Sequence, residues 1–423
     1  MKKYAKLLAA ILIFVMAFGI TGCQKEEESK EFSPKLDTDK KVTLRTTGFF
    51  GNFEALDQVT ADFNQYYPNV EFSYEQVGGD DFETYLKANP DVDIMMTSQD
   101  IFDRAGSSFE EQCADLSKDV DVSDLDENML KVAYHGKKLS AIPMGQNMYG
   151  LIVNTTLLEK EGLSVPTNYE EFVKVLKALK KKGYTPIQGP NSKVYAELMQ
   201  SMAFDMILND ENLYKDLKAG KASAADQLEV VFSKLKEITG DGFIDAKVNE
   251  NYPDDNYDQA ILNFFQGDVP FWVCNTEKVS GMKKRESKSE AFKKHPFDYE
   301  YIYAPLGENG AYAYAEPWVG FSVNKDSEDY EYAMEFVRFL ATKDEINQMA
   351  DIKGIPSIAK EKNDVAIYKN VLNTDKTEMN CINKGKITPA MVTNWYATVS
   401  KYASGDFKTE KEAAKYFVDL CSK

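Results

Sequence analysis

Strands and helices alternate at the beginning of this chain, and this order restricts its fold more than any other feature. Residues 42–47 predict a strand, and residues 56–63 place apolar side chains at helical spacing until Pro68 ends the helix. Residues 70–74 alternate as a second strand does, and residues 91–96 predict a third, buried strand. Strand, helix and strand in this order predict a parallel α/β sheet, whose carboxyl ends carry loops suited to ligands.

Helical patterns continue to the end of the chain. Thr167 is expected to cap a helix while Glu170 reaches back to it, and Lys180–Gly183 close that helix with basic side chains and a glycine. Residues 333–340 and 413–420 repeat the same apolar stripe. We therefore expect an α/β chain throughout.

The N-terminus has the layout of a secretory signal. Three lysines precede an apolar run at residues 7–20, which is too short to span a bilayer comfortably. The run ends in Ile20-Thr21-Gly22-Cys23, which resembles the lipobox of bacterial lipoproteins. This resemblance implies removal of residues 1–22 and a lipid anchor on Cys23, outside the cell. A plain signal peptide, or a buried helix with a chance cysteine, is the alternative.

Size and charge limit the partners. Removal of the signal leaves 401 of the 423 residues, enough for two domains, and changes the formal charge from −18 to −21 because the signal carries three lysines and no acid. Such a polyanion is a poor partner for nucleic acid or anionic headgroups, so its soluble partners should be neutral or cationic. Residues 23–40 are charged and poor in large apolar groups, so we expect a flexible tether.

Cysteines and histidines are too few and too scattered for a metal centre, so we expect neither a metal nor a cofactor. The two histidines, His135 and His295, are far apart. The widely spaced cysteines leave open whether they form disulfides or stay as isolated thiols; they are Cys113, Cys274, Cys381 and Cys421.

Six short segments, in order, resemble the extracellular solute-binding proteins of ABC importers, in particular the group similar to maltose- and multiple-sugar-binding proteins. Tyr169 stands where tryptophan is usual in that family, and Pro270 and Phe271 replace a common alanine and methionine. The segments together span most of the mature chain; they are 136–143 with 150–154, 165–172, 264–270, 318–324, 385–389 and 394–397.

The resemblance implies a two-lobed fold of the periplasmic-binding-protein type, class II, with hinge-linked lobes and a ligand cleft between them. One lobe would comprise residues 41–147 and 318–350, and the other residues 148–317 and 351–423. A monomer of this kind binds a solute by cleft closure and delivers it to permease subunits, and it is not an enzyme. We expect the solute to be a neutral oligosaccharide.

Sugars need aromatic platforms, and this chain has three tryptophans. Trp395 falls where an aromatic side chain stacks on the sugar in the family, so we expect Trp395→Ala to weaken binding and leave the fold intact; an ordinary core role is the alternative. Trp318 lies at the predicted second crossing between lobes and is equally open to either role. Trp272 lies inside an apolar strand, where core packing is favoured. Tyr195 could add a platform, although core packing is favoured there too.

Short polar side chains at strand ends are the other candidates, because they can donate and accept hydrogen bonds. For each one, a solvated loop position is the alternative. Gln146 and Asn147 occupy the first predicted crossing, where the family places a ligand-binding side chain. The remaining polar candidates follow predicted strands and are Ser98, Gln99, Asp100, Asn275 and Thr276. Phe50 and Asn52 lie in the first loop, where the family often grips a sugar hydroxyl.

Other functions stay open at this point. A receptor for a peptide, a polyamine or a metal complex would have the same architecture. A surface glycoside hydrolase or lyase would need a positioned acid and base, and adjacent acids such as Asp80-Asp81 arise by composition in so acidic a chain. No Gly-x-Ser-x-Gly elbow, phosphate loop or zinc spacing occurs in the sequence. An adhesin that never hands on its cargo is a third alternative.

Overall fold

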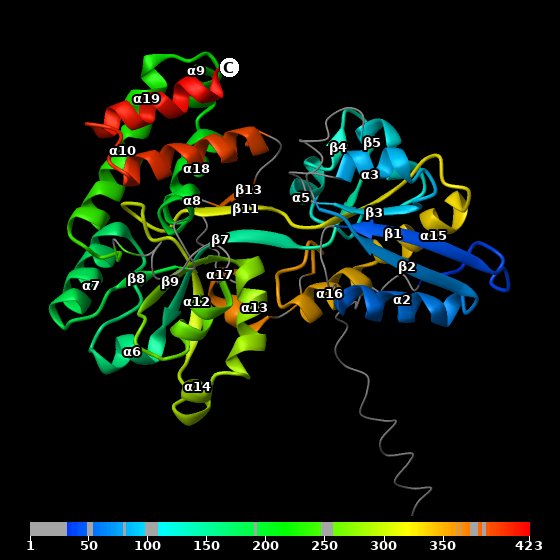
Figure 1. Cartoon of the computed structure of the whole chain (residues 1–423), viewed down its shortest axis with the longest axis horizontal. Coiled ribbons are helices and arrows are strands. Elements are labelled where there is room, and N and C mark those ends of the chain that lie inside the picture. Colours follow the sequence, from blue (N-terminus) through cyan, green and yellow to red (C-terminus); the bar gives the residue numbers. More distant parts are fainter. Residues whose placement is uncertain are drawn as a thin grey trace, which may run out of the picture. The chain divides into compact units, whose positions relative to one another are not determined.

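The computed structural model describes residues 32–48, 54–78, 82–97, 109–189, 193–245, 247, 257–361, 363, 365–372, 380–382 and 386–423. Ser33–Lys423 form one compact unit. Within it, two separate sheets each carry their own helices (Figure 1). No helix in the described ranges is long and apolar enough to cross a membrane.

The first sheet confirms the predicted order of strand, helix and strand. Its strands run β2-β1-β3-β12-β6; β1 pairs in parallel with β2 and β3, and β12 pairs antiparallel with β3 and β6. The bounds are β1 Val42–Gly48, β2 Val70–Gln76, β3 Ile94–Thr97, β6 Ile142–Pro143 and β12 Gly320–Val323. β3 begins at Ile94, because the Arg45 N–H of β1 donates to the Asp93 carboxylate at 2.7 Å and not to a backbone carbonyl, although the Asp93 N–H still donates to Arg45 O at 2.9 Å.

Helices of the first sheet pack through aromatic side chains. The ring centroid of Phe336 on α15 lies 5.2 Å from that of Phe63 on α2 and 4.8 Å from that of Phe72 on β2. α2 also contacts α16, and the two helices lie together beneath the strands in Figure 1. The elements are α2 Glu54–Tyr66, α3 Phe82–Ala88, η1 Leu116–Lys118, α5 Glu127–Lys131, α15 Tyr330–Leu340 and α16 Lys343–Lys353, with the small hairpin β4 Tyr134–His135 and β5 Lys138–Leu139.

The second sheet is built around one long strand, β7, Gln146–Asn154. β9 pairs antiparallel along one side of β7, while β10 and β11 share the other side. The sheet order is β13-β11-β7-β9-β8, with β10 paired to β7. The bounds are β8 Ile187–Gln188, β9 Phe271–Asn275, β10 Tyr299–Tyr303, β11 Ala313–Pro317 and β13 Asn380–Ile382.

Helices supply most of the second core. α10 and α19 pack on each other, and α8 packs against β7, β9 and β11. α15 and α19 include the apolar stripes predicted at 333–340 and 413–420. The helices are α6 Thr155–Lys160, α7 Tyr169–Lys181, α8 Val194–Asn209, α9 Glu211–Lys218, α10 Ala222–Gly240, α12 Tyr257–Phe264, α13 Thr276–Glu286, α14 Glu290–Lys294, η2 Ala366–Tyr368, α17 Lys369–Leu372, α18 Pro389–Ala403 and α19 Glu410–Cys421.

The capping box of α7 is shifted by one residue from the prediction. Asn168, not Thr167, is the N-cap, and its Oδ1 accepts the N–H of Glu171 at 3.0 Å. Glu171, not Glu170, reaches back to the Thr167 N–H at 2.8 Å. The predicted C-terminal glycine is confirmed, because Gly183 follows α7 with φ of 94°. Both asparagine and threonine are good caps, so the sequence pattern alone did not decide the register.

Neighbouring passages of chain connect the two sheets. β6 continues into β7 and β11 into β12, and these passages bond to each other through Trp318 N–H to Gly145 O at 2.8 Å and Met144 N–H to Val319 O at 2.8 Å. A third stretch joins them where the Gln146 N–H donates to Pro356 O at 2.9 Å. Passages paired in this way between two lobes, here antiparallel to each other, are the usual hinge of a two-lobed fold.

One detail differs from the expected hinge. Asp126 N–H donates to Ile358 O and Lys360 N–H donates to Asp124 O, so the chain stays with the first sheet past residue 350, later than the implied lobe boundary. The glycine at position 150, just after the first passage, allows close packing of β7 on β10, because a Cβ there would lie 2.3 Å from Ile302 O.

Candidate functional site

Polar side chains gather at one edge of the second sheet. In the antiparallel pairing, Asn147 of β7 stands opposite Glu316 of β11, and Tyr149 stands opposite Asn275 of β9. The beginning of β7 and the ends of β9 and β11 therefore meet at this edge. Asn147, Tyr149 and Asn275 are each 8% exposed, so this edge touches solvent. We call this set, together with Tyr314, the strand-end site.

The Glu316 carboxylate is the centre of the strand-end site. Tyr149 Oη donates to Glu316 Oε1 at 2.8 Å, and Tyr314 Oη donates to Glu316 Oε2 at 2.9 Å. Asn147 Nδ2 donates to Tyr149 Oη at 3.3 Å. Burial, followed by the Glu316 charge, holds the pKa of Tyr149 well above its usual value, so this hydroxyl stays a donor at neutral pH. The carboxylate is thus fixed in place as a hydrogen-bond acceptor.

Thr276 joins the site to the first turn of α13. Its Oγ1 donates to Gln146 O at 2.9 Å and accepts the Met148 N–H at 3.1 Å. Asn275 caps α13 by accepting the Lys278 N–H at 3.1 Å. The side chain of Gln146 points elsewhere, because its Nε2 donates to Ser357 O at 2.8 Å. Four predicted residues, at 146, 147, 275 and 276, are therefore neighbours.

Helix α8 contributes a buried polar face beside this edge. Ser201 Oγ donates to Tyr149 O at 3.2 Å, and Glu197 pairs with the ammonium of Lys278. Glu197 is 4% exposed and Gln200 is completely buried. Within the described ranges, the Gln200 amide and Glu197 Oε2 have no hydrogen-bond partner.

Trp395 lies in the second core. Its side chain is 1% exposed, and its Nε1 donates to Ala196 O at 3.0 Å. Its ring centroid lies 5.5 Å from those of Phe232 and Phe417. This is the core role that the sequence analysis weighed as the alternative. The expectation that Trp395→Ala leaves the fold intact is therefore corrected, because the change would open a cavity in this core.

Tyr396, the next residue, is the aromatic side chain of α18 that interacts with the site. Burial, and then the charges of Glu197 and Glu316, raise its pKa well above the usual value. It is also more exposed than Trp395. Tyr396, Tyr149 and Glu316 were not predicted from the sequence, although the pattern Glu-Pro-Trp at a predicted crossing was a signal for Glu316.

Two other predicted residues, Trp318 and Tyr195, do not join this set. Trp318 is 8% exposed and lies at the crossing, with Lys353 Nζ 5.9 Å from its ring centroid. Tyr195 is partly buried against the second core, and its hydroxyl donates to Asp245 O at 3.4 Å. Outside the described residues are Cys23, Phe50, Asn52, Ser98, Gln99 and Asp100.

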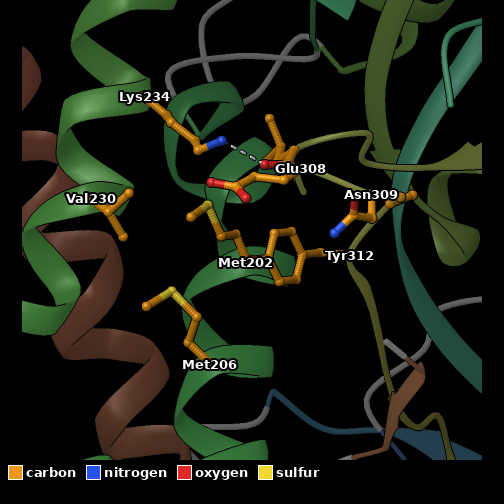
Figure 2. Close-up of a pocket in the computed structure, with 10 residues that line it drawn as sticks. Met202, Met206, Val230, Lys234, Glu308, Asn309 and Tyr312 are labelled. Atoms are coloured by element: carbon orange, nitrogen blue, oxygen red, sulfur yellow. Dashed lines mark hydrogen bonds between the residues drawn. The ribbon is translucent and has the colours of Figure 1, made fainter. Parts of the chain in front are cut away.

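A pocket of about 420 Å³ lies between α8, α10 and the loop that precedes β11 (Figure 2). Met202, Met206 and Tyr312 line it, and Tyr312 lies before the start of β11, whereas Glu316 lies near its end. Lys234 on its wall donates to Leu306 O at 2.9 Å and stands 3.6 Å from the centroid of the Tyr169 ring. The pocket is therefore separate from the strand-end site. The described residues contain no group of histidine, cysteine and acidic side chains that could hold a metal ion.

Comparisons with known proteins agree on one family. Residues 58–374 match the family described as bacterial extracellular solute-binding protein. The melibiose/raffinose/stachyose-binding protein MelE of Bacillus subtilis strain 168 is 23% identical over 375 residues, which cover 84% of this chain and 81% of MelE.

Solved structures show the same two-lobed fold. A sugar transporter protein from Bacillus licheniformis in complex with stachyose matches with a TM-score of 0.65 at 20% identity, covering 89% of this chain and 98% of that one. The binding protein MsmE of Bacillus subtilis subsp. subtilis strain 168, in an open conformation, matches with a TM-score of 0.69 at 18% identity, covering 91% and 97%. The expected fold class is thereby confirmed.

Proposed function

The chain belongs to the bacterial extracellular solute-binding proteins, and from this premise we propose that it is a lipid-anchored receptor that captures a neutral oligosaccharide and delivers it to the permease of an ABC importer. The observation that carries this proposal is the fixed Glu316 carboxylate, held by Tyr149 and Tyr314 next to the Asn147 amide. A sugar presents many hydroxyls, and each one binds best to acceptors and donors that are already oriented.

The charges of the site favour a neutral ligand. Lys278 is paired with Glu197, so its ammonium charge is already balanced, and Glu316 adds a negative charge. An anionic ligand would meet a net negative site, whereas sugar hydroxyls can donate to the carboxylate. Tyr396 supplies an aromatic ring beside the two acids, as a sugar C–H face requires.

The relatives support the same class of ligand. MelE is named for melibiose, raffinose and stachyose, and the matched structure from Bacillus licheniformis holds stachyose. These three sugars therefore come first in a binding panel. A cationic solute such as a polyamine is the second candidate, because both Glu197 and Glu316 lie at the site.

Closure of the two lobes is the proposed mechanism. The strand-end site lies where β7 begins and β11 ends, directly beside the passages that connect the sheets. A ligand that contacts both lobes binds the closed form more tightly than the open form and so shifts their equilibrium. This mechanism requires no reaction and no cofactor.

Calorimetry and thermal shift across a panel of neutral glycans, polyamines and peptides test the proposal. A neutral oligosaccharide should raise the melting temperature, because a ligand of the folded state stabilises it. Glu316→Gln should weaken that binding at least tenfold. Glu300→Gln is the matched control, since Glu300 is a half-buried glutamate of β10 whose carboxylate accepts from Asn370.

Two outcomes would contradict the proposal. Tight binding of a polyamine with no response to any glycan would identify a different solute. New reducing ends after incubation with oligosaccharides would indicate a glycoside hydrolase instead of a receptor.

A further inference from the structure

The chain just before β1 is bonded to the folded body of the first sheet. The backbone N–H groups of Lys35 and Leu36 both donate to Tyr67 Oη, at 3.1 and 3.2 Å. The Lys35 N–H also donates to Glu335 Oε1 at 2.9 Å. Tyr67 follows α2, and Glu335 lies on α15. We call residues 33–37 the strap.

Both ends of the strap are held by α15. Arg338 Nη2 donates to the carbonyl oxygen of Ser33 at 2.6 Å. Tyr332 Oη donates to the carbonyl oxygen of Asp37 at 2.8 Å. The strap therefore has a defined conformation held through its backbone, so this part of residues 23–40 is not the flexible tether that the sequence predicts.

The groups that hold the strap are themselves buried and connected. Tyr67 is completely buried, and Glu335 is 4% exposed. Tyr67 Oη donates to Glu335 Oε1 at 2.6 Å while it accepts the two strap N–H groups. Arg338 Nε donates to Glu335 Oε2 at 2.9 Å. Because each group has several partners, removing one of them leaves buried polar atoms unpaired, which is unfavourable.

The strap shortens the reach of the chain. Ten residue steps separate Cys23 from Ser33, and 17 steps separate Cys23 from Lys40. At about 3.5 Å per extended residue, the distance from Cys23 to the strap is at most about 35 Å, compared with about 60 Å for a tether that is free up to Lys40. The shorter limit is similar to the hydrophobic thickness of a membrane, about 30 Å.

We propose that the strap fixes the point where the anchored chain leaves the fold, so that the face of the first lobe formed by α15 and the end of α2 is presented to the lipid bilayer. The partner is thus a membrane surface, reached through the proposed lipid on Cys23. A receptor held in this way keeps its second lobe farther from the bilayer than its first. The inference rests on the proposed lipid anchor, but not on the identity of the solute.

Trypsin cleavage of the full chain tests the strap itself. Tyr67→Phe removes the hydroxyl that accepts the N–H groups of Lys35 and Leu36, so cleavage after Lys35 should become about tenfold faster. Tyr66→Phe, at the neighbouring tyrosine, is the matched control and should leave the rate unchanged. Equal rates of cleavage after Lys35 in Tyr67→Phe and in the unaltered chain would show that Tyr67 does not hold the strap. Cleavage after Lys30, which precedes the strap in the sequence, is the internal reference.

Energy transfer to a bilayer tests the orientation. Lipidated protein is placed on phosphatidylcholine vesicles that carry an acceptor dye. All variants contain Cys381→Ser. A donor dye is attached either at Glu331→Cys of α15 or at Lys411→Cys of α19. Transfer should be stronger from position 331. The difference in transfer between the two positions should disappear when Tyr67→Phe is combined with Arg338→Ala. The circular dichroism spectrum of this double variant should remain that of the unaltered chain.

Any other outcome of the energy-transfer measurement contradicts the proposal. Equal transfer from both positions in the unaltered strap would overturn the fixed orientation. A difference that persists in the double variant would show that something other than the strap sets it. Failure of the chain to associate with vesicles would overturn the anchor and this inference together, whereas glycan binding by the same sample in solution would leave the receptor function standing.

Discussion

At the scale of single residues, one step along α18 separates a core side chain from a candidate binding side chain. Trp395 packs among Phe204, Phe232 and Phe417, whereas Tyr396 lies near the charges of Glu197 and Glu316. The two residues point about 100° apart on a helix, so one can be buried while its neighbour faces a ligand. They should therefore respond differently to truncation.

Trp395→Ala should lower the free energy of unfolding by about 3–5 kcal/mol, because the indole is completely enclosed and its loss opens a cavity. Urea denaturation followed by circular dichroism measures this. Phe407→Ala, a partly buried aromatic at the margin of the same core, is the comparison and should have a smaller effect. A Trp395 variant as stable as the parent would contradict the packing described above.

Tyr396→Ala should weaken oligosaccharide binding by about 1–2 kcal/mol, since it removes an aromatic face and a hydroxyl that interacts with the charges of Glu197 and Glu316. Calorimetry with the best ligand of the panel is the measurement, and Tyr396→Phe separates the ring from the hydroxyl. Unchanged affinity in Tyr396→Ala would show that another residue supplies the aromatic platform.

At the scale of elements, the contact between α2 and α16 contains a carboxyl group with an unusual environment. Glu345, in the first turn of α16, has its pKa raised to about 7 by burial and, to a lesser extent, by the charges of Asp62 and Asp344. Its Oε2 has no hydrogen-bond partner in the described ranges. The folded chain therefore holds a proton on Glu345 at a pH where the unfolded chain has lost it.

The sign of the resulting pH dependence follows from linkage. Between about pH 4.5 and pH 7 the folded state binds more protons at Glu345 than the unfolded state, so its contribution to stability falls as pH rises through this window. Glu345→Gln should remove that fall and stabilise the protein at pH 8 by about 1 kcal/mol, with allowance for solvent screening. Melting temperatures of both proteins at pH 5 and pH 8 are the check. A difference that does not change with pH would exclude Glu345 as the cause.

Local patterns predicted the elements well, and their failures have local causes too. The apolar spacing at 56–63 and the alternation at 70–74 correctly predicted α2 and β2. The N-cap of α7 lies one residue later than predicted, because Asn168 and Thr167 are both good N-caps and Asn168 is the one that accepts the Glu171 N–H. β3 was predicted three residues too long at its start, because Asp93 accepts a bond from Arg45, which lies far away in the sequence.

The strand-end site was only partly predictable. Asn147 and Asn275 were singled out by their positions at strand ends, and they lie at the same edge of the sheet, with Asn275 opposite Tyr149 and Asn147 opposite Glu316. Glu316 could not be identified in the same way, because its importance comes from the hydroxyls of Tyr149 and Tyr314, and the first of these lies on another strand. The register between β7 and β11 decides that contact, and no local pattern in either strand reveals it.

At the scale of the whole molecule, ligand binding should make the protein more compact. Both passages between the sheets, at 143–146 and 317–320, run beside the strand-end site. Small-angle scattering with a saturating ligand should give a smaller radius of gyration than the free protein, as in other hinged binding proteins. An unchanged radius at saturation would exclude closure even where binding is real.

Cys23→Ser should release the protein from the membrane fraction or leave its signal unprocessed. The motivation is that Ile20-Thr21-Gly22-Cys23 offers a thiol as the attachment point for lipid. Cell fractionation and labelling with a radioactive fatty acid measure the change, and Cys113→Ser is the control because Cys113 is a buried thiol within the fold. Unchanged fractionation with retained lipid label would refute the anchor.

The strap also determines where a mechanical load enters the protein. A pull on the N-terminus reaches Tyr67, just after α2, and Tyr332 and Arg338 of α15, all of which pack with the first sheet. A pull that is opposed by drag on the first lobe therefore bypasses the passages at 143–146 and 317–320. A receptor stretched in this way by a moving membrane would keep its hinge unloaded, and its affinity for the solute would not change with the tension on the proposed anchor.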